Sequence, residues 1–104
     1  MKITDTFQKS LDTYIDTVQT TLTRHIKDVW NGKEGWEDFV GVMGVMVGSK
    51  YIKVVRSNRS VYGFIKIEDG SLWKAAGWKG PERNFSRGNL FDETTWNVNP
   101  YSIG

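Results

Sequence analysis

Residues 51–76 read YIKVVRSNRSVYGFIKIEDGSLWKAA, and this stretch decides the fold. It contains three runs rich in β-branched and aromatic residues, at Tyr51–Arg56, Ser60–Ile67 and Ser71–Ala76. Ser57-Asn58-Arg59 is a plausible hairpin turn between the first two runs, and Glu68-Asp69-Gly70 is a stronger turn signal before the third. We therefore expect an antiparallel meander of three strands.

A long amphipathic helix is expected before the meander, from about Asp5 to Trp30. Apolar residues recur there at steps of three and four, which places them on one helical stripe. Thr4 or Asp5 can cap the start, and Asn31-Gly32 is typical of a helix end. The stripe consists of Phe7, Leu11, Tyr14, Ile15, Val18, Leu22, Ile26 and Val29.

This helix is slightly long for a domain of its size. At 1.5 Å per residue it would measure about 39 Å, whereas a compact domain of this length is about 33 Å across. It should therefore bend or pack against a second copy. A heptad seam on it predicts a homodimer interface of Leu11, Ile15, Val18, Leu22, His25 and Val29.

The segment from Trp36 to Gly48 has two interpretations. Its four valines favour a strand, whereas Gly41, Gly44 and Gly48 would share one face of a helix. We favour a short second helix whose glycine face lies close to a neighbouring element, and the strand stays open as the alternative.

After Gly77 the regular patterns end, and the tail is rich in glycine, asparagine and aromatic residues. A tail with so many large rings is expected to wrap the domain as ordered coil. Its aromatic residues are Trp78, Phe85, Phe91, Trp96 and Tyr101. The predicted fold is one α+β domain over residues 1–104, with a long N-terminal helix, a short second helix, a three-stranded antiparallel meander and an irregular aromatic tail.

Composition limits the functional classes. The chain has 104 residues and no cysteine, which excludes disulfides and thiolate metal sites and fits a reducing cytoplasm. Its longest apolar run, Phe39 to Val47, is less than half of the ~20 residues that cross a bilayer, so no membrane association is expected.

No catalytic centre is apparent either. His25 is the only histidine and lies on the predicted helix seam, which argues against a catalytic triad. The segment Gly44 to Lys50 has shorter spacing than a phosphate-binding loop and reverses its Lys and Ser. We therefore expect no enzyme activity, no metal and no cofactor.

Positive charge gathers in the second half of the chain. Residues 1–49 carry five Lys/Arg and seven Asp/Glu, whereas residues 50–104 carry nine and five. The segment from Trp73 to Asn89 holds four basic residues, one acid and three aromatic residues. Such a segment can grip a phosphate backbone, since each cation adds affinity that does not depend on sequence.

The meander adds a second basic and aromatic surface. If Ile52, Val54 and Ile65 face the helices, rings and lysines alternate on the other face, as stacking on unpaired bases requires. In the alternative, the aromatic tail covers this face and the lysines only surround it. The candidate nucleic-acid-binding residues are Lys53, Tyr62, Phe64, Lys66, Lys74, Trp78, Lys79, Arg83 and Arg87.

Two stretches, EDGSLWKAAGWKGP at 68–81 and RGNLFD at 87–92, carry a resemblance. They combine an acidic-Gly turn, an aromatic-Lys-Ala-Ala strand, Trp-x-x-Pro and Arg-Gly-Asn-Leu-Phe. This pattern resembles small proteins of tailed phages, a group without an established activity. The resemblance implies a phage context and a location in the host cytoplasm.

We therefore expect a non-enzymatic binding module. The leading hypothesis is nucleic-acid binding through the basic, aromatic C-terminal half. The alternatives are an accessory factor that inhibits or modulates a host protein through the helices, and a minor component of the virion.

Overall fold

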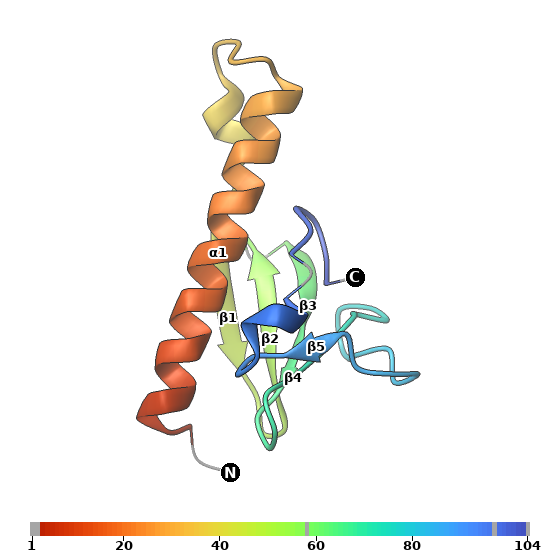
Figure 1. Ribbon diagram of the computed structural model, residues 1–104. Helices are drawn as coiled ribbons and strands as arrows, with labels where there is room; N and C mark the ends of the chain where they lie inside the picture. Colours follow the sequence, from red (N-terminus) through yellow and green to blue (C-terminus); the bar gives the residue numbers. More distant parts are fainter. Residues whose placement is uncertain (1–2, 58, 97, 104) are drawn as a thin grey trace.

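The computed structural model describes residues 3–57, 59–96 and 98–103. This part of the chain forms one long helix against one face of a five-stranded antiparallel sheet, so the fold is α+β as expected (Figure 1). The strands lie in sequence order across the sheet. The elements are α1 (Asp5–Val29), the 3-10 turn η1 (Trp36–Phe39), β1 (Met43–Val47), β2 (Tyr51–Arg56), β3 (Ser60–Lys66), β4 (Ser71–Trp73), β5 (Gly88–Asn89) and the 3-10 turn η2 (Glu93–Thr95).

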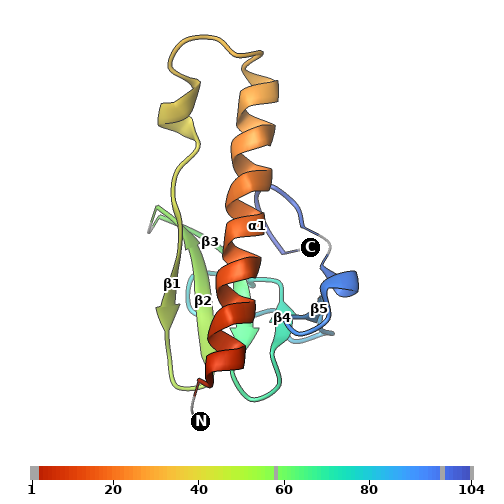
Figure 2. The ribbon, with the colours of Figure 1, turned by 60° about the vertical axis from the view of Figure 1, so that its left-hand side comes forward.

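The predicted first helix is confirmed. The Thr4 hydroxyl accepts a hydrogen bond from the Phe7 amide at 3.1 Å, which satisfies one of the free amides at the start of a helix. The helix lies against the sheet (Figure 2), and its apolar stripe forms the core together with residues of the sheet. The buried residues of α1 are Phe7, Leu11, Tyr14, Val18, Leu22 and Ile26.

The last turns of α1 extend past the sheet, which accounts for the 44 Å length of the molecule (Figure 1). The returning chain packs on them. The rings of Trp30 and Phe39 lie 4.5 Å apart, and the Lys27 ammonium lies 6.0 Å from the Trp36 ring. The excess length of the helix is therefore covered by residues 30–40 of the same chain.

This packing corrects the predicted dimer seam. Leu11, Val18 and Leu22 are buried in the chain's own core and offer no surface to a second copy. His25 is partly buried, with its ring 5.1 Å from the ring of Tyr101. Of the six predicted residues, half-buried Ile15 and His25 and exposed Val29 are accessible. Association of two chains stays a prediction.

The predicted second helix is wrong. Residues 36–48 form η1 and then β1, which pairs with β2 along its whole length. Gly41 has a φ of 77°, a conformation that interrupts a helix, and the Gln19 side chain of α1 bonds the Gly41 carbonyl and the Met43 amide. The valines of this segment predicted a strand correctly, whereas the spacing of its glycines predicted a helix that does not form.

The meander is confirmed in β2, β3 and β4, but the predicted total of three strands is wrong because β1 and β5 extend the sheet at both edges. The turn at Gly70 is confirmed, with a φ of 74° and its amide 2.8 Å from the Lys66 carbonyl. Of the other predicted turn, Asn58 lies outside the described residues.

A β-bulge in β3 changes which side chains face α1. Val54 pairs with Gly63 and Val55 with Val61, so Tyr62 is an extra residue in the ladder. Tyr62 therefore joins the core. Its hydroxyl donates a hydrogen bond to the Asn99 carbonyl at 2.6 Å.

The tail wraps the domain as expected, with β5 and η2 as short regular pieces. Leu90 and Ile103 are buried in the core. Trp96 packs its ring 5.0 Å from that of Tyr14, and Phe91 lies 5.5 Å from Phe7. Among the described residues, no helix has the length and apolar character needed to cross a membrane.

Candidate functional site

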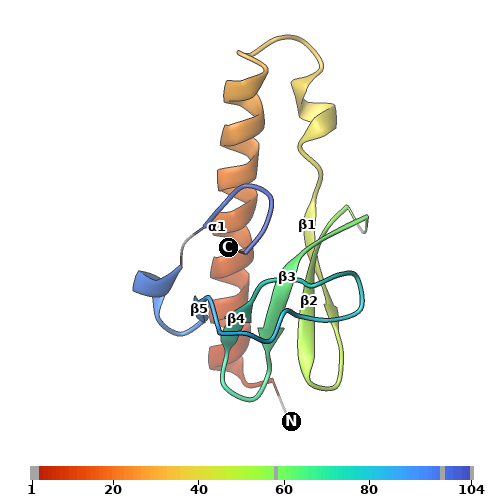
Figure 3. The ribbon, with the colours of Figure 1, turned by 90° about the vertical axis from the view of Figure 1, so that its right-hand side faces the viewer.

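A loop of residues 74–87 crosses the face of the sheet opposite α1 (Figure 3). Backbone hydrogen bonds hold it in place: the Glu82 amide donates to the Lys74 carbonyl at 2.7 Å, and the Arg87 amide donates to the Leu72 carbonyl at 2.7 Å. At the tip, the Ala76 amide donates to Gly80 at 3.0 Å. These bonds fix the backbone of the loop over this face of the sheet.

A cavity of about 390 Å³ lies between this loop, the β1–β2 turn and the sheet. Four of its lining residues are cations, Lys50, Lys53, Lys79 and Arg83, and none is acidic. We call this cavity the cationic groove. Its lining is Met46, Val47, Gly48, Ser49, Lys50, Tyr51, Lys53, Phe64, Lys79, Gly80, Pro81 and Arg83.

A second cavity of about 320 Å³ continues the groove along β3. It shares Ser49, Lys50, Tyr51 and Arg83 with the first cavity and adds Lys66 and Glu68. Glu68 is the one acid in either lining, at the far end. Five cations therefore border one continuous basic surface. They are Lys50, Lys53, Lys66, Lys79 and Arg83.

Asp69, which follows Glu68 in the sequence, forms hydrogen bonds with Ser71. The Asp69 carboxylate accepts hydrogen bonds from the Ser71 hydroxyl at 2.6 Å and the Ser71 amide at 2.9 Å. These bonds lower the pKa of Asp69, and the positive charge of Lys66 lowers it further. Lys66 therefore lies close enough to Asp69 for their charges to interact.

Two aromatic rings beside the groove keep exposed surface. Trp78 is 42% exposed, and the Lys53 ammonium lies 4.1 Å from the centre of its ring, within the range of a cation–π contact. Tyr51 is half-buried and packs edge-on against Phe64, with ring centres 6.1 Å apart. Phe64 itself forms the buried base of the groove.

The one acid of the loop, Glu82, forms an ion pair with Arg87 and does not line the groove. Arg87 pairs with Glu82 at 3.3 Å, and its guanidinium also lies 3.8 Å from the Phe85 ring centre. Glu82 is the only acid between residues 74 and 87. Because Arg87 neutralises Glu82, the charges of Lys79 and Arg83 are left uncompensated within the described loop.

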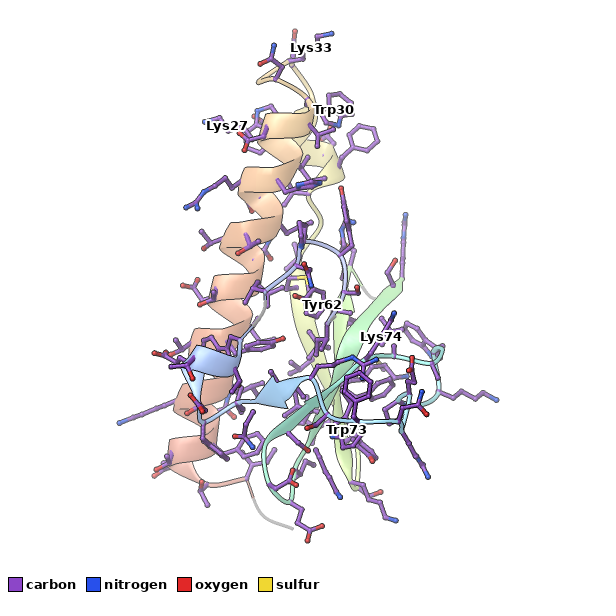
Figure 4. The ribbon with its side chains drawn as sticks, turned by 45° about the vertical axis from the view of Figure 1, so that its right-hand side comes forward. Lys27, Trp30, Lys33, Tyr62, Trp73 and Lys74 are labelled. Atoms are coloured by element: carbon purple, nitrogen blue, oxygen red, sulfur yellow. The ribbon has the colours of Figure 1, made fainter. Side chains whose placement is uncertain are left out.

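The structure corrects part of the predicted site. Tyr62 is 2% exposed and Phe64 is 3% exposed, so neither can stack on a base. Arg87 is committed to Glu82. Lys74 is exposed but lines neither cavity, and Figure 4 shows Tyr62 near α1 with Lys74 on the opposite side of the sheet. The residues that the fold does bring together are Lys53, Lys66, Trp78, Lys79 and Arg83.

Sequence reasoning missed Lys50 and Ser49 at the centre of the site. Both lie in the β1–β2 turn, where the Gly48 amide donates to the Tyr51 carbonyl at 2.9 Å. The signal was present: reading residues 43–47 as a strand makes Gly48-Ser49-Lys50 a hairpin turn at the end of the sheet, where Lys50 lines the same cavity as Lys53. The predicted helix did not indicate this turn.

The groove suits an anionic, partly flat ligand better than a metal ion. Within residues 3–57, 59–96 and 98–103, no cluster of three or more His, Asp or Glu side chains could hold a metal. The uncompensated cations attract phosphate groups, and Tyr51 and Trp78 offer ring surface at the same rim.

Comparison with known proteins places the chain in a family but gives no activity. No curated protein and no solved structure matches the chain. One family model, described as a family of unknown function, matches residues 1–99. Because the match covers nearly the whole chain, the protein belongs to this family, DUF7717.

Proposed function

We propose that the protein binds nucleic acid, and single strands in preference to duplexes, through the cationic groove. The observation that carries the proposal is the lining itself: four cations and no acid around one cavity of about 390 Å³. The phage context and cytoplasmic location rest on sequence resemblance and composition and stay proposals.

The shape of the site supports a single strand. The cations surround a hollow between the β1–β2 turn and the loop, and a flexible chain of phosphates can enter it more readily than a stiff duplex. Exposed ring surface at Tyr51 and Trp78 can stack on unpaired bases, which a duplex keeps inside its own stack. Such binding should tolerate many sequences, because every base has an aromatic face.

The test is fluorescence anisotropy with a labelled oligo-dT of about ten nucleotides and a hairpin duplex at low salt. The groove variant replaces Lys50, Lys53, Lys79 and Arg83 with glutamine. It should lose most of the affinity for oligo-dT, and wild type should bind oligo-dT more tightly than the duplex.

A matched variant separates the groove from net charge. It replaces four exposed lysines outside the groove, so both variants change the net charge from +2 to −2. Its positions are Lys9, Lys27, Lys33 and Lys74. Figure 4 shows Lys27 and Lys33 at the far end of α1 from the sheet. Equal loss of binding in both variants, or no binding by wild type, contradicts the proposal.

A further inference from the structure

The outer edge of β1 has backbone groups that no described segment pairs. In the described chain, β1 pairs only with β2. The Gly48 amide bonds Tyr51 and the Ser57 amide bonds the Val42 carbonyl, and bonded pairs alternate along an antiparallel ladder. Gly44 and Met46 therefore point their backbone groups at β2, and the intervening residues point theirs outward.

Part of this edge is already closed by α1. The Gln19 side chain accepts from the Met43 amide at 2.8 Å and donates to the Gly41 carbonyl at 3.1 Å. The amides and carbonyls of Val45 and Val47 have no such partner in the described residues. These two positions form a short open edge of the kind that accepts an added strand.

A groove lies beside the open edge, between α1 and β1. It has a volume of about 350 Å³, and no Lys or Arg lines it. Its apolar surface comes mainly from Ile15 and Val45, and two carboxylates, Asp12 and Asp16, lie on its helix side. The lining of this α1–β1 groove is Gln8, Leu11, Asp12, Ile15, Asp16, Gln19, Met43, Gly44 and Val45.

We propose that the α1–β1 groove binds an extended polypeptide segment, which adds to β1 as an outer strand. The backbone of the segment bonds Val45 and Val47, its alternate apolar side chains pack on Ile15 and Val45, and its basic side chains face Asp12 and Asp16. The charge of the groove selects this occupant: two acids and no cation favour a basic strand and disfavour a nucleic acid.

A second copy of the chain fits the groove less well. Two β1 strands paired antiparallel are related by a two-fold axis that leaves both α1 helices on the same face of the joined sheet. The Asp12 and Asp16 carboxylates of the two copies would then line one interface. Like charges brought together there disfavour self-pairing.

The experiment selects binders from a displayed library of random peptides of about ten residues, long enough for one strand. Enriched peptides are synthesised and titrated into labelled protein. We expect alternating β-branched residues with one or more Lys or Arg, and NMR shifts concentrated at the Val45 and Val47 amides. Val45→Pro should abolish binding and keep the fold, since the lost amide faces the open edge.

Charge reversal supplies a test that does not depend on the proline. Asp12→Lys with Asp16→Lys should weaken binding about tenfold at low salt, because two exposed ion pairs become repulsions. The control reverses Asp28 and Glu34, two exposed acids outside the groove, and should bind like wild type. The proposal is overturned if no peptide is enriched, if enriched peptides are acidic, or if both double variants bind equally.

Self-association is the remaining outcome. If the wild type without peptide has twice the monomer mass by light scattering and Val45→Pro does not, the edge is occupied by a second copy. That result also overturns the proposal of a foreign strand. Oligonucleotide binding at the cationic groove is measured separately and depends on different charged side chains, although Val47 of the open edge also lines that groove.

Discussion

Replacement of Tyr62 by phenylalanine tests the position that the structure changes most from the sequence prediction. The side chain is 2% exposed, and its hydroxyl donates to the Asn99 carbonyl at 2.6 Å. Removal of one buried hydrogen bond costs about 1 kcal/mol of unfolding free energy. We expect Tyr62→Phe to be destabilised by about that amount at neutral pH, without change in fold.

The pH dependence of the unfolding free energy gives a second, more specific prediction for the same variant. Burial raises the pKa of Tyr62 from 10.0 to about 12, against the opposing effects of its bonds with Asn99 and Tyr14. Burial also raises the pKa of Tyr14. Because the folded state holds these protons more tightly, their contribution to stability is constant below pH 10 and is lost as the pH rises through the folded pKa values.

Each such tyrosine lowers the unfolding free energy by about 1.4 kcal/mol per pH unit within this window. Two contribute about 3 kcal/mol per unit, and Tyr62→Phe should lose about half of that slope. The assay is urea unfolding at intervals from pH 8 upward, followed by tryptophan fluorescence. The same lysines are present in both proteins, so their contribution cancels in the comparison.

Tyr101→Phe is the control, since it removes a tyrosine hydroxyl from a half-exposed side chain, and a change of slope limited to Tyr62→Phe would identify burial as its cause. Parallel curves for wild type and Tyr62→Phe from pH 8 to pH 12 would refute the reasoning. They would mean that the Tyr62 hydroxyl reaches solvent, and the predicted stacking surface on this strand would have to be reconsidered.

Three further predictions concern the groove, the bulge and the edge. Neutralising up to four phosphates predicts a log–log salt slope of about −2.8 for oligo-dT, or about a 50-fold loss of affinity from 50 to 200 mM salt, and the groove variant should show a nearly flat slope in the same titration. Gly63→Ala should lose about 1–3 kcal/mol in urea unfolding, since a Cβ there would lie 2.6 Å from Ile103 Cγ1 and 2.9 Å from the Trp73 carbonyl. Gln19→Met should cost about 1–2 kcal/mol and speed hydrogen exchange at the Met43 amide, whereas unchanged exchange would contradict its role at the edge.

The helix and the central strands could be predicted because their signals are local. The period of the stripe, the Thr4 cap and the turn at Gly70 each depend on a few neighbouring residues. The segment 36–48 could not be predicted in the same way. Its conformation depends on pairing with β2 and on the Gln19 side chain, which is distant in sequence.

The candidate site was predictable in its charge but not in its geometry. Strict alternation along β3 places Tyr62 and Phe64 on one face, and the bulge breaks that alternation. No local pattern indicates an extra residue at Tyr62, because the bulge is defined by the pairing of β3 with β2 and places Tyr62 in the core. Likewise, the pairing of Arg87 with Glu82 depends on how the loop folds back.

The two proposed surfaces depend on one structural feature, the period of β1. Successive side chains of a strand point to opposite faces, so Met46 lines the cationic groove while Val45 lines the α1–β1 groove. The sheet therefore separates a basic surface from an acidic one by its own thickness. A polyanion attracted to the first is repelled by the second, and a basic strand has the reverse preference. Opposite charge on the two faces of one edge strand would thus direct the two proposed ligands to different sites, which approach each other at Val47, a residue of the open edge that also lines the cationic groove.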